Sequence, residues 1–142
     1  MDCIRRLKPS SSSGRIAIPV KVIDASAAVA WLFDEPEHQR VRERVLRGPL
    51  AAPALLPFEI ANACAKKMRR QPERREELIA AFAVLFEIEI DYWDVDHQAV
   101  LTLANAAGLS AYDASYLWLA QRLDAELITL DQQLATAAST VR

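Results

Sequence analysis

The chain has 142 residues, 52% of them hydrophobic, which suits one domain with a buried core. Cys3 and Cys64 lie far apart and match neither a disulfide framework nor a zinc site, so we expect a reducing compartment and a cytoplasmic protein. No stretch approaches membrane-spanning length, and the basic start is not followed by the apolar run of a signal peptide; we expect no membrane association.

Charge is distributed unevenly along the chain, although the net charge is only -2. Residues 36–75 carry ten Lys/Arg against four Asp/Glu, whereas residues 76–142 carry two against eleven. This asymmetry predicts a basic face beside an acidic one. Taken alone, the basic residues fit a solvated helix surface; beside an acidic site they would suit a phosphate backbone. They are Arg40, Arg42, Arg44, Arg47, Lys66, Lys67, Arg69 and Arg70.

The first half of the chain predicts two strands separated by helices. Residues 1–15 include four consecutive serines and predict a flexible N-terminal tail, which leaves 16–142 as the folded domain. Residues 16–23 predict a strand whose regular part begins after Pro19. An apolar run after Asp24 predicts a buried helix that stops near Asp34, followed by a second helix over 37–47. Residues 50–53 predict a short strand of weak propensity.

The second half continues this alternation of helices and strands. Helical spacing predicts helices from Pro57 to about Pro72, over 73–86, from the Asp96 cap to Gly108, and over 110–123. Strands are expected over 88–93 and 126–130, and a last short helix opens at Asp131. The alternation predicts an α/β fold whose parallel sheet is covered on both faces, with ligands at the carboxyl ends of its strands.

Four acidic residues lie just after a strand or in the first turn of a helix. Each one has a purely structural explanation. Three of them occupy positions typical of helix caps or a capping box, and the fourth could complement a helix dipole. In that order, they are Asp24, Asp113, Asp131 and Glu59.

Their shared placement at one edge of the sheet is the stronger indication. Converging carboxylates repel one another and raise one another's pKa values unless a cation holds them. Hard oxygen ligands at this density suit Mg²⁺ or Mn²⁺. Ser26 and Thr129, each two residues from one of the acids, could add hydroxyls to the same site or could be filler. The sequence therefore predicts a divalent-metal site.

Four segments together resemble the PIN-domain ribonucleases, and most closely the VapC-type toxins of bacterial toxin-antitoxin pairs. They are VIDASAAVAWL, LLPFEIANA, LSAYDASYLWLA and LITLDQQL. The resemblance runs from about residue 20 to the C-terminus. It implies a PIN-like three-layer α/β/α domain with a central, mainly parallel sheet of four or five strands.

The resemblance also implies a metal-dependent endoribonuclease that leaves a 5′-phosphate and a 3′-hydroxyl. Asp24 and Asp113 would bind the metal directly, Glu59 would complete or support that position, and Asp131 would belong to the same cluster. Ser26 and Thr129 match hydroxyl positions of the family. The chain departs from the family at Gln132 and Gln133, where many relatives carry basic residues, and in leaving little room for a last edge strand.

The expected partners are RNA, a small antitoxin protein and a second copy of the chain. RNA would be single-stranded or looped, since a strand must lie across the acidic site. Four aromatic residues could contribute to protein-binding surfaces, although aromatic residues at helical spacing more often belong to the core. They are Trp31, Phe33, Phe58 and Trp118.

Other functions fit the sequence less well. A phosphoacceptor domain pairs a mid-sheet Asp with a Lys after a late strand, and no Lys occurs beyond Lys67. Dinucleotide binding lacks its glycine motif, because the three glycines are widely separated. The alternative that stays open is a noncatalytic PIN-like binding module, which metal titration would distinguish from an enzyme.

Overall fold

Four short parallel strands form the centre of the molecule in the order β3-β2-β1-β4. The computed structural model describes residues 18–140. Lys21 is paired with Leu50 on one side and Glu126 on the other, so β1 is a central strand. The strands are β1 (Lys21–Ile23), β2 (Leu50–Pro53), β3 (Ile90–Trp93) and β4 (Glu126–Ile128). The parallel sheet predicted from the sequence is confirmed.

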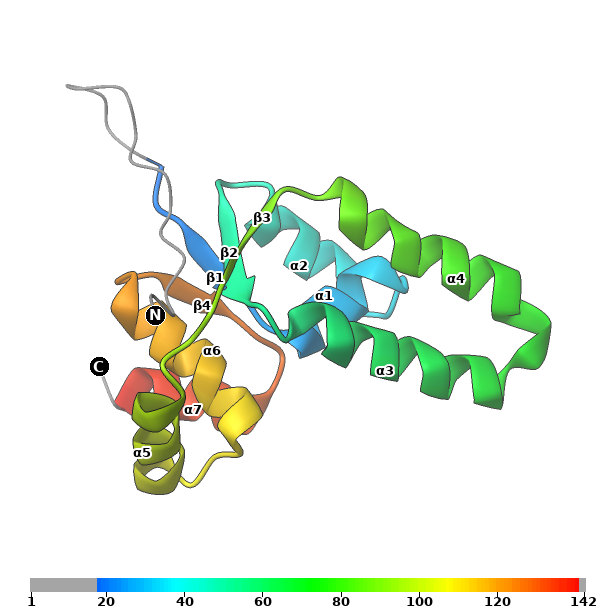
Figure 1. Cartoon of the computed structure of the whole chain (residues 1–142). Coiled ribbons are helices and arrows are strands. Elements are labelled where there is room, and N and C mark those ends of the chain that lie inside the picture. The colour runs from blue at the N-terminus through cyan, green and yellow to red at the C-terminus, as the bar shows by residue number, and fades with distance from the viewer. Residues whose placement is uncertain (1–17, 141–142) are drawn as a thin grey trace.

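Helices cover both faces of this sheet and complete the predicted three-layer arrangement. In Figure 1, α1 to α4 gather on one side and α5 to α7 on the other, while α3 and α4 project away from the sheet as a pair. The helices are α1 (Ala25–Leu32), α2 (His38–Val45), α3 (Leu56–Arg70), α4 (Arg75–Ala83), α5 (His97–Ala107), α6 (Ala111–Arg122) and α7 (Gln132–Thr140). Two 3-10 turns, η1 (Pro72–Arg74) and η2 (Val84–Glu87), flank α4.

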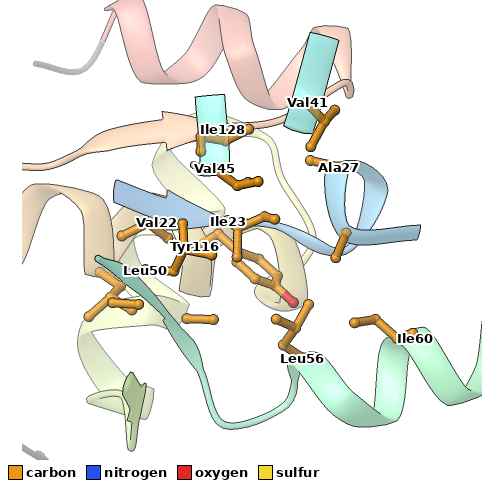
Figure 2. Close-up of a cluster of buried hydrophobic side chains, with 14 of the residues drawn as sticks. Val22, Ile23, Ala27, Val41, Val45, Leu50, Leu56, Ile60, Tyr116 and Ile128 are labelled. Atoms are coloured by element: carbon orange, nitrogen blue, oxygen red, sulfur yellow. The ribbon is translucent and has the colours of Figure 1, made fainter. Parts of the chain in front are cut away.

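The core lies around the central strands. Val22 and Ile23 of β1 and Ile128 of β4 are fully buried, as expected for parallel strands covered on both faces. Side chains from these strands pack with Val41 and Val45 of α2 and with Tyr116 of α6 (Figure 2). The weak strand β2 forms despite its two alanines and its proline because all four of its residues are buried between the layers.

The observed elements differ from the predicted ones mainly at their ends. The helix predicted over 73–86 is divided into η1, α4 and η2, and the strand predicted over 88–93 begins at Ile90. The last strand stops at Ile128 because the Leu130 N–H donates to the Ser26 hydroxyl at 2.9 Å instead of continuing the ladder. The first strand is regular only from Lys21. The predicted tail, 1–15, lies outside the described residues.

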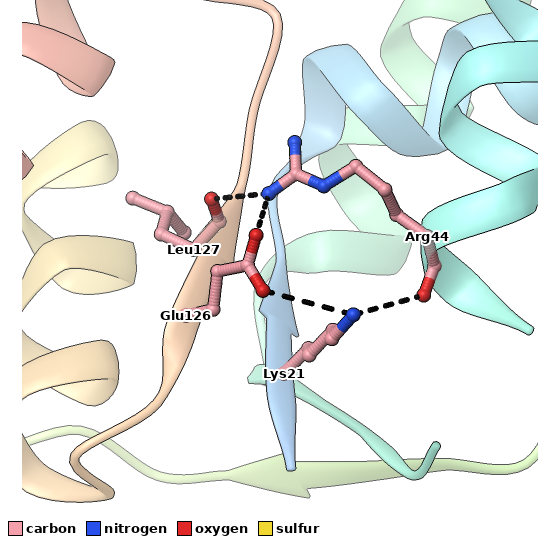
Figure 3. Close-up of polar contacts among 4 residues, drawn as sticks. All are labelled: Lys21, Arg44, Glu126 and Leu127. Carbon is pink, nitrogen blue, oxygen red and sulfur yellow. Dashed lines mark hydrogen bonds and ion pairs between the residues drawn. The ribbon is translucent and has the colours of Figure 1, made fainter. Parts of the chain in front are cut away.

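A charged network joins α2 to the amino-terminal end of the sheet (Figure 3). The Arg44 guanidinium bonds the Glu126 carboxylate and donates to the Leu127 carbonyl at 3.4 Å. Lys21 Nζ lies 3.6 Å from the same carboxylate and donates to the Arg44 carbonyl at 3.4 Å. These contacts hold α2 against β1 and β4 at the edge opposite the four acids.

Across residues 18–140, every helix is too short or too polar to cross a bilayer.

Candidate active site

Asp24 ends β1 and begins α1. Its backbone is extended, and its side chain accepts a hydrogen bond from the Ala27 N–H at 2.9 Å, so the predicted helix cap is real. The residue is only 3% exposed, which is unusual for an aspartate. A buried carboxylate at the end of the central strand lies where parallel α/β sheets bind their ligands.

Two hydroxyls hold the Asp24 carboxylate in place. Ser26 donates to Oδ1 at 2.8 Å, and Thr129 donates to Oδ2 at 2.5 Å. Each hydroxyl also accepts a backbone N–H from the segment after β4, from Leu130 to Ser26 and from Asp131 to Thr129. Ser26 and Thr129 thus both donate hydrogen bonds to Asp24, and together these contacts join the ends of β1 and β4.

Glu59 lies in the first turn of α3 and meets α6 across the site. Its Oε1 accepts a hydrogen bond from the Tyr116 hydroxyl at 2.6 Å. Tyr116 is 1% exposed, and its ring lies among the core side chains with the hydroxyl at the α3 end (Figure 2). The sequence analysis did not single out Tyr116. The available indication was its position three residues after Asp113, on a helix whose buried tyrosine needs a hydrogen-bond partner.

Asp113 lies in the first turn of α6, and Asp131 immediately precedes α7. The Asp113 N–H donates to the Ser110 hydroxyl at 3.1 Å, so Ser110 caps α6 as its capping-box pattern predicted. Asp131 accepts the Leu134 N–H at 2.8 Å and caps α7. α6 runs into the start of β4, so its own first turn lies at the carboxyl-terminal edge of the sheet.

The charges of the acids are coupled. Burial raises the pKa of Asp24; hydrogen bonds from Thr129, Ala27 and Ser26 oppose this rise, and the charge of Asp113 adds to it. Burial also raises the pKa of Glu59, where the Tyr116 hydroxyl opposes the rise and the charges of Asp113 and Asp24 reinforce it. Three carboxylates therefore disfavour one another's ionised form.

Asp131 joins this group through Asp113. Burial is the main cause that raises the pKa of Asp113. The charge of Asp131 raises this pKa further, and the Ser110 hydroxyl lowers it. The structure thus brings the four predicted acids to one edge of the sheet, and the Asp131 N–H is linked to Asp24 through the Thr129 hydroxyl.

The oxygen atoms of the acids decide whether the predicted metal fits this site. A carboxylate offers about four lone-pair sites, and Asp24 uses three of them on Ala27, Ser26 and Thr129. Oε2 of Glu59 and the carboxylate of Asp113 add further oxygens, and oxygen ligands suit Mg²⁺ or Mn²⁺ chemically. Nevertheless, among the described residues no three His, Cys, Asp or Glu side chains are grouped closely enough to form a metal centre. The chemistry of the donors fits a hard cation, and the ligand group is not preassembled.

An open hollow of about 480 Å³ is lined by one of the four acids, Glu59. Its lining also includes Ser26, Asn62 and Lys66, together with two further carboxylates, Glu35 and Glu37. A larger hollow of about 680 Å³ runs along β4 between α6 and α7, but none of the four acids lines it. We assign the site to the smaller hollow because its lining contains Glu59, a carboxylate of this group, and a cation, Lys66, on the same face of α3.

Comparison with known proteins identifies the family. The PIN domain profile matches residues 21–139, nearly all of the described chain. The chain belongs to the PIN-domain family. Ribonuclease VapC3 of Pyrobaculum aerophilum is 30% identical over 119 residues, which span 80% of this chain and 91% of that protein. Ribonuclease VapC9 of Mycobacterium tuberculosis is 30% identical over 114 residues, which span 80% and 87%. The predicted resemblance to VapC-type PIN domains is confirmed.

A solved structure supports the fold of this PIN domain. The crystal structure of PAE2754 from Pyrobaculum aerophilum superposes with a TM-score of 0.58 and 24% sequence identity, covering 89% of this chain and 95% of that one. At that identity the likeness concerns the fold alone. The three-layer α/β/α class predicted from the sequence is confirmed by it.

One of the two glutamines that depart from the family pattern, Gln133, has a structural role in this PIN domain. Gln133 stands where many relatives carry a basic residue, and its Nε2 donates to the Gly108 carbonyl at 3.0 Å. This bond ties α7 to the turn that precedes α6. Gln132 is the first residue of α7, and its side chain is exposed. The basic residues predicted to flank the site are divided: Lys66 lines the hollow, Lys67 pairs with Glu35 at 3.0 Å, and Arg44 lies at the opposite edge.

Proposed function

We propose that this PIN domain is a divalent-metal-dependent endoribonuclease and the toxin component of a type II toxin-antitoxin system. Asp24, Glu59 and Asp113 would hold Mg²⁺ or Mn²⁺, and Asp131 would help to bind a second ion or orient the attacking water. The relatives named VapC ribonucleases support the ribonuclease class. The metal and the residue roles are our extension of that class.

One observation carries the metal proposal. Burial raises the pKa values of three carboxylates at one sheet edge and neighbouring carboxylate charges raise them further, and part-buried hydroxyls nevertheless fix Asp24 in position. Repulsion of this kind opposes folding, and a bound cation relieves it. A helix cap alone would not need three acids from three separate helices to face one another.

The chain's own residues would prepare the site for hydrolysis. A divalent cation bound there supplies charge neutralisation and lowers the pKa of a coordinated water. Ser26 and Thr129 hold the Asp24 carboxylate in one orientation, and Tyr116 does the same for Glu59. Water attacks the phosphorus, the bond to the 3′-oxygen breaks, and the products carry a 5′-phosphate and a 3′-hydroxyl. Lys66 lines the same hollow and would support the strand's phosphates.

The proposal is tested by changing Asp24 or Asp113 to Asn and measuring cleavage of a single-stranded RNA with Mg²⁺ or Mn²⁺. We expect cleavage to fall by at least about 100-fold, the usual size of losses in positioned electrostatic groups. Asp94→Asn, at an exposed aspartate after β3, is the matched control and should keep full activity. Undiminished cleavage by folded Asp113→Asn protein would refute the assignment.

A noncatalytic binding module is the second candidate, favoured by the lack of a preassembled three-ligand group among the described residues. Calorimetric titration with Mn²⁺ separates the two candidates. A catalytic site predicts binding by the wild-type protein and weaker binding by Asp113→Asn. If neither protein bound the ion in the presence of RNA, the binding-module function would replace the enzymatic one.

The partners and location belong to the same proposal. We expect a small cognate antitoxin, a homodimer and a cytoplasmic location, in keeping with the VapC-type relatives. The aromatic residues considered for protein surfaces divide in the structure: Phe33 is buried, Trp31 and Trp118 pack against the core, and Phe58 is exposed. Co-purification of the protein with the product of a neighbouring small gene, followed by sizing of the complex, tests the antitoxin and the dimer together.

A further inference from the structure

Two aromatic side chains next to the acids are exposed without a packing reason. Phe58 is 81% exposed and directly precedes Glu59, and Tyr112 is 64% exposed and directly precedes Asp113. Of the other aromatic residues, Trp93 and Tyr116 are buried, and Phe86, although exposed, packs edge-on against Phe82. A phenylalanine this exposed gains little from the fold of its own chain.

Both rings stand on the helix turns that form the acid site. Phe58 and Glu59 share the first turn of α3, and Tyr112 and Asp113 share the first turn of α6. Tyr112 lies four residues before Tyr116, so the two occupy the same stripe of α6. The Tyr116 hydroxyl bonds Glu59, and Tyr112 therefore lies on the α3-facing stripe one turn closer to the open end of the site.

We propose that Phe58 and Tyr112 are stacking platforms for bases of single-stranded RNA on the two sides of the cleaved bond. The inference rests on the proposed ribonuclease function and adds how the site positions its substrate. Every base presents a flat face to an aromatic ring, so such contacts hold a strand in place without demanding one sequence. The acids act on the backbone between the two stacked bases.

The surroundings of the rings favour nucleic acid over a protein partner. Asn62 and Lys66 follow Glu59 at steps of three and four residues, and all three line the same hollow. Arg69 and Arg70 continue the polar face toward the end of α3. Lys66, Arg69 and Arg70 thus offer cations for phosphates on the helix that carries Phe58, and aromatic rings combined with cations are typical of surfaces that bind single strands.

The test compares Phe58→Leu and Tyr112→Leu with a matched control, Phe86→Leu. Leucine keeps an apolar side chain and removes the ring, and Phe86 is 67% exposed in η2, which follows α4. Each protein is titrated, without divalent cation, into a single-stranded RNA oligonucleotide that carries 2-aminopurine. We expect each site variant to bind about tenfold more weakly and to lose quenching of the fluorescent base, while the control matches wild type.

A second measurement separates stacking from a structural effect. With Mg²⁺ present, the leucine variants should raise KM for RNA cleavage more than they lower kcat. Phe58→Trp, which keeps an aromatic ring, should have the KM of wild type. If both leucine variants kept the RNA affinity and the quenching of wild type, the inference would be overturned. The same conclusion would hold if these variants lost only the binding of a protein partner. If the wild-type protein bound the oligonucleotide with quenching but never cleaved RNA, the proposed function would fail and the stacking surface would remain.

Discussion

At the scale of single residues, Asp24 combines a structural and a chemical role in one carboxylate. It caps α1, joins the ends of β1 and β4 through two hydroxyls, and keeps a lone pair on Oδ2. Its burial opposes ionisation, while the three hydrogen bonds favour it. The surrounding hydroxyls therefore tune when this carboxylate carries its charge.

Thr129→Val should weaken both stability and activity. The change removes a hydrogen bond to a charged group and leaves the Asp131 N–H without its acceptor, at a cost of about 2 kcal/mol in the free energy of unfolding. Because the Thr129 bond lowers the pKa of Asp24, its loss raises that pKa. The acid limb of the pH–activity profile should move to higher pH, and Thr129→Ser should restore it. An unchanged acid limb would show that the ionisation of Asp24 does not limit cleavage.

Asp113→Asn should stabilise the protein in the absence of divalent cation. The pKa values of Asp24, Glu59 and Asp113 are raised in the folded state, so the folded protein holds protons that the unfolded chain has released. Stability consequently falls as pH rises above about 4, and removal of one charge recovers part of it. Calorimetry in EDTA should show a higher Tm for the variant at pH 7.5 and convergence with wild type near pH 4.

Divalent cation should reverse this order. Added Mg²⁺ stabilises the form that binds it, so the Tm of wild type should rise more than that of Asp113→Asn. Asp94→Asn should follow wild type with and without the ion. If Asp113→Asn were less stable than wild type in EDTA at neutral pH, the carboxylates would not repel one another as their coupled pKa values indicate.

At the scale of elements, the turn between α5 and α6 sets the position of Asp113. Gly108 ends α5 in the left-handed conformation, with φ of 67°, and Ser110 caps α6 two residues later. Gln133 of α7 bonds the Gly108 carbonyl and fixes the turn from outside. The first turn of α6 is therefore fixed by the Ser110 cap and by the bond from α7 before any ligand binds.

Ser110→Ala should destabilise this turn and loosen the site. Loss of the cap typically costs about 1 kcal/mol, because the Asp113 N–H loses its acceptor. Urea denaturation measures the loss, and Ser110→Thr, which keeps a hydroxyl cap, should restore most of it. RNA cleavage should fall in parallel with the cap, since the Asp113 carboxylate belongs to the same turn. Equal stability of the alanine and threonine variants would contradict the role of the cap.

The same elements show what sequence patterns can predict. Local capping and periodicity placed α5, α6 and the acids correctly, because these features depend on neighbours in the chain. The division of residues 73–86 into three pieces, the early end of β4 and the Tyr116–Glu59 bond depend on contacts between distant segments. The exposure of Phe58 also differs from the core position favoured by its helical spacing, because its side of α3 has no neighbouring layer.

At the scale of the whole molecule, the uneven charge of the sequence becomes a spatial division. The basic segment supplies α2 and α3, and the acidic segment supplies α4 to α7 together with two of the four site acids. Only part of the basic segment faces the site, because Arg44 is bound at the other edge and Lys67 pairs with Glu35. Lys66 lines the hollow together with Glu59, and Arg69 and Arg70 follow it along α3.

Removal of three cations from α3 should weaken the salt dependence of RNA binding. In the variant Lys66→Gln, Arg69→Gln, Arg70→Gln, a plot of log K against log salt should become less steep by about 2, since each single-strand phosphate contact contributes roughly 0.7. Arg122→Gln, at the end of α6, should leave the slope unchanged. Fluorescence anisotropy across a salt series measures both. An unchanged slope in the triple variant would place the phosphates elsewhere.

The network of Lys21, Arg44 and Glu126 has a practical consequence for handling the protein. It closes the amino-terminal edge of the sheet, whereas every candidate site residue lies at or near the other edge. A surface-attached form anchored beside this network would therefore present its nuclease site to the solution. Single-molecule observation of RNA turnover would then be free of obstruction by the support.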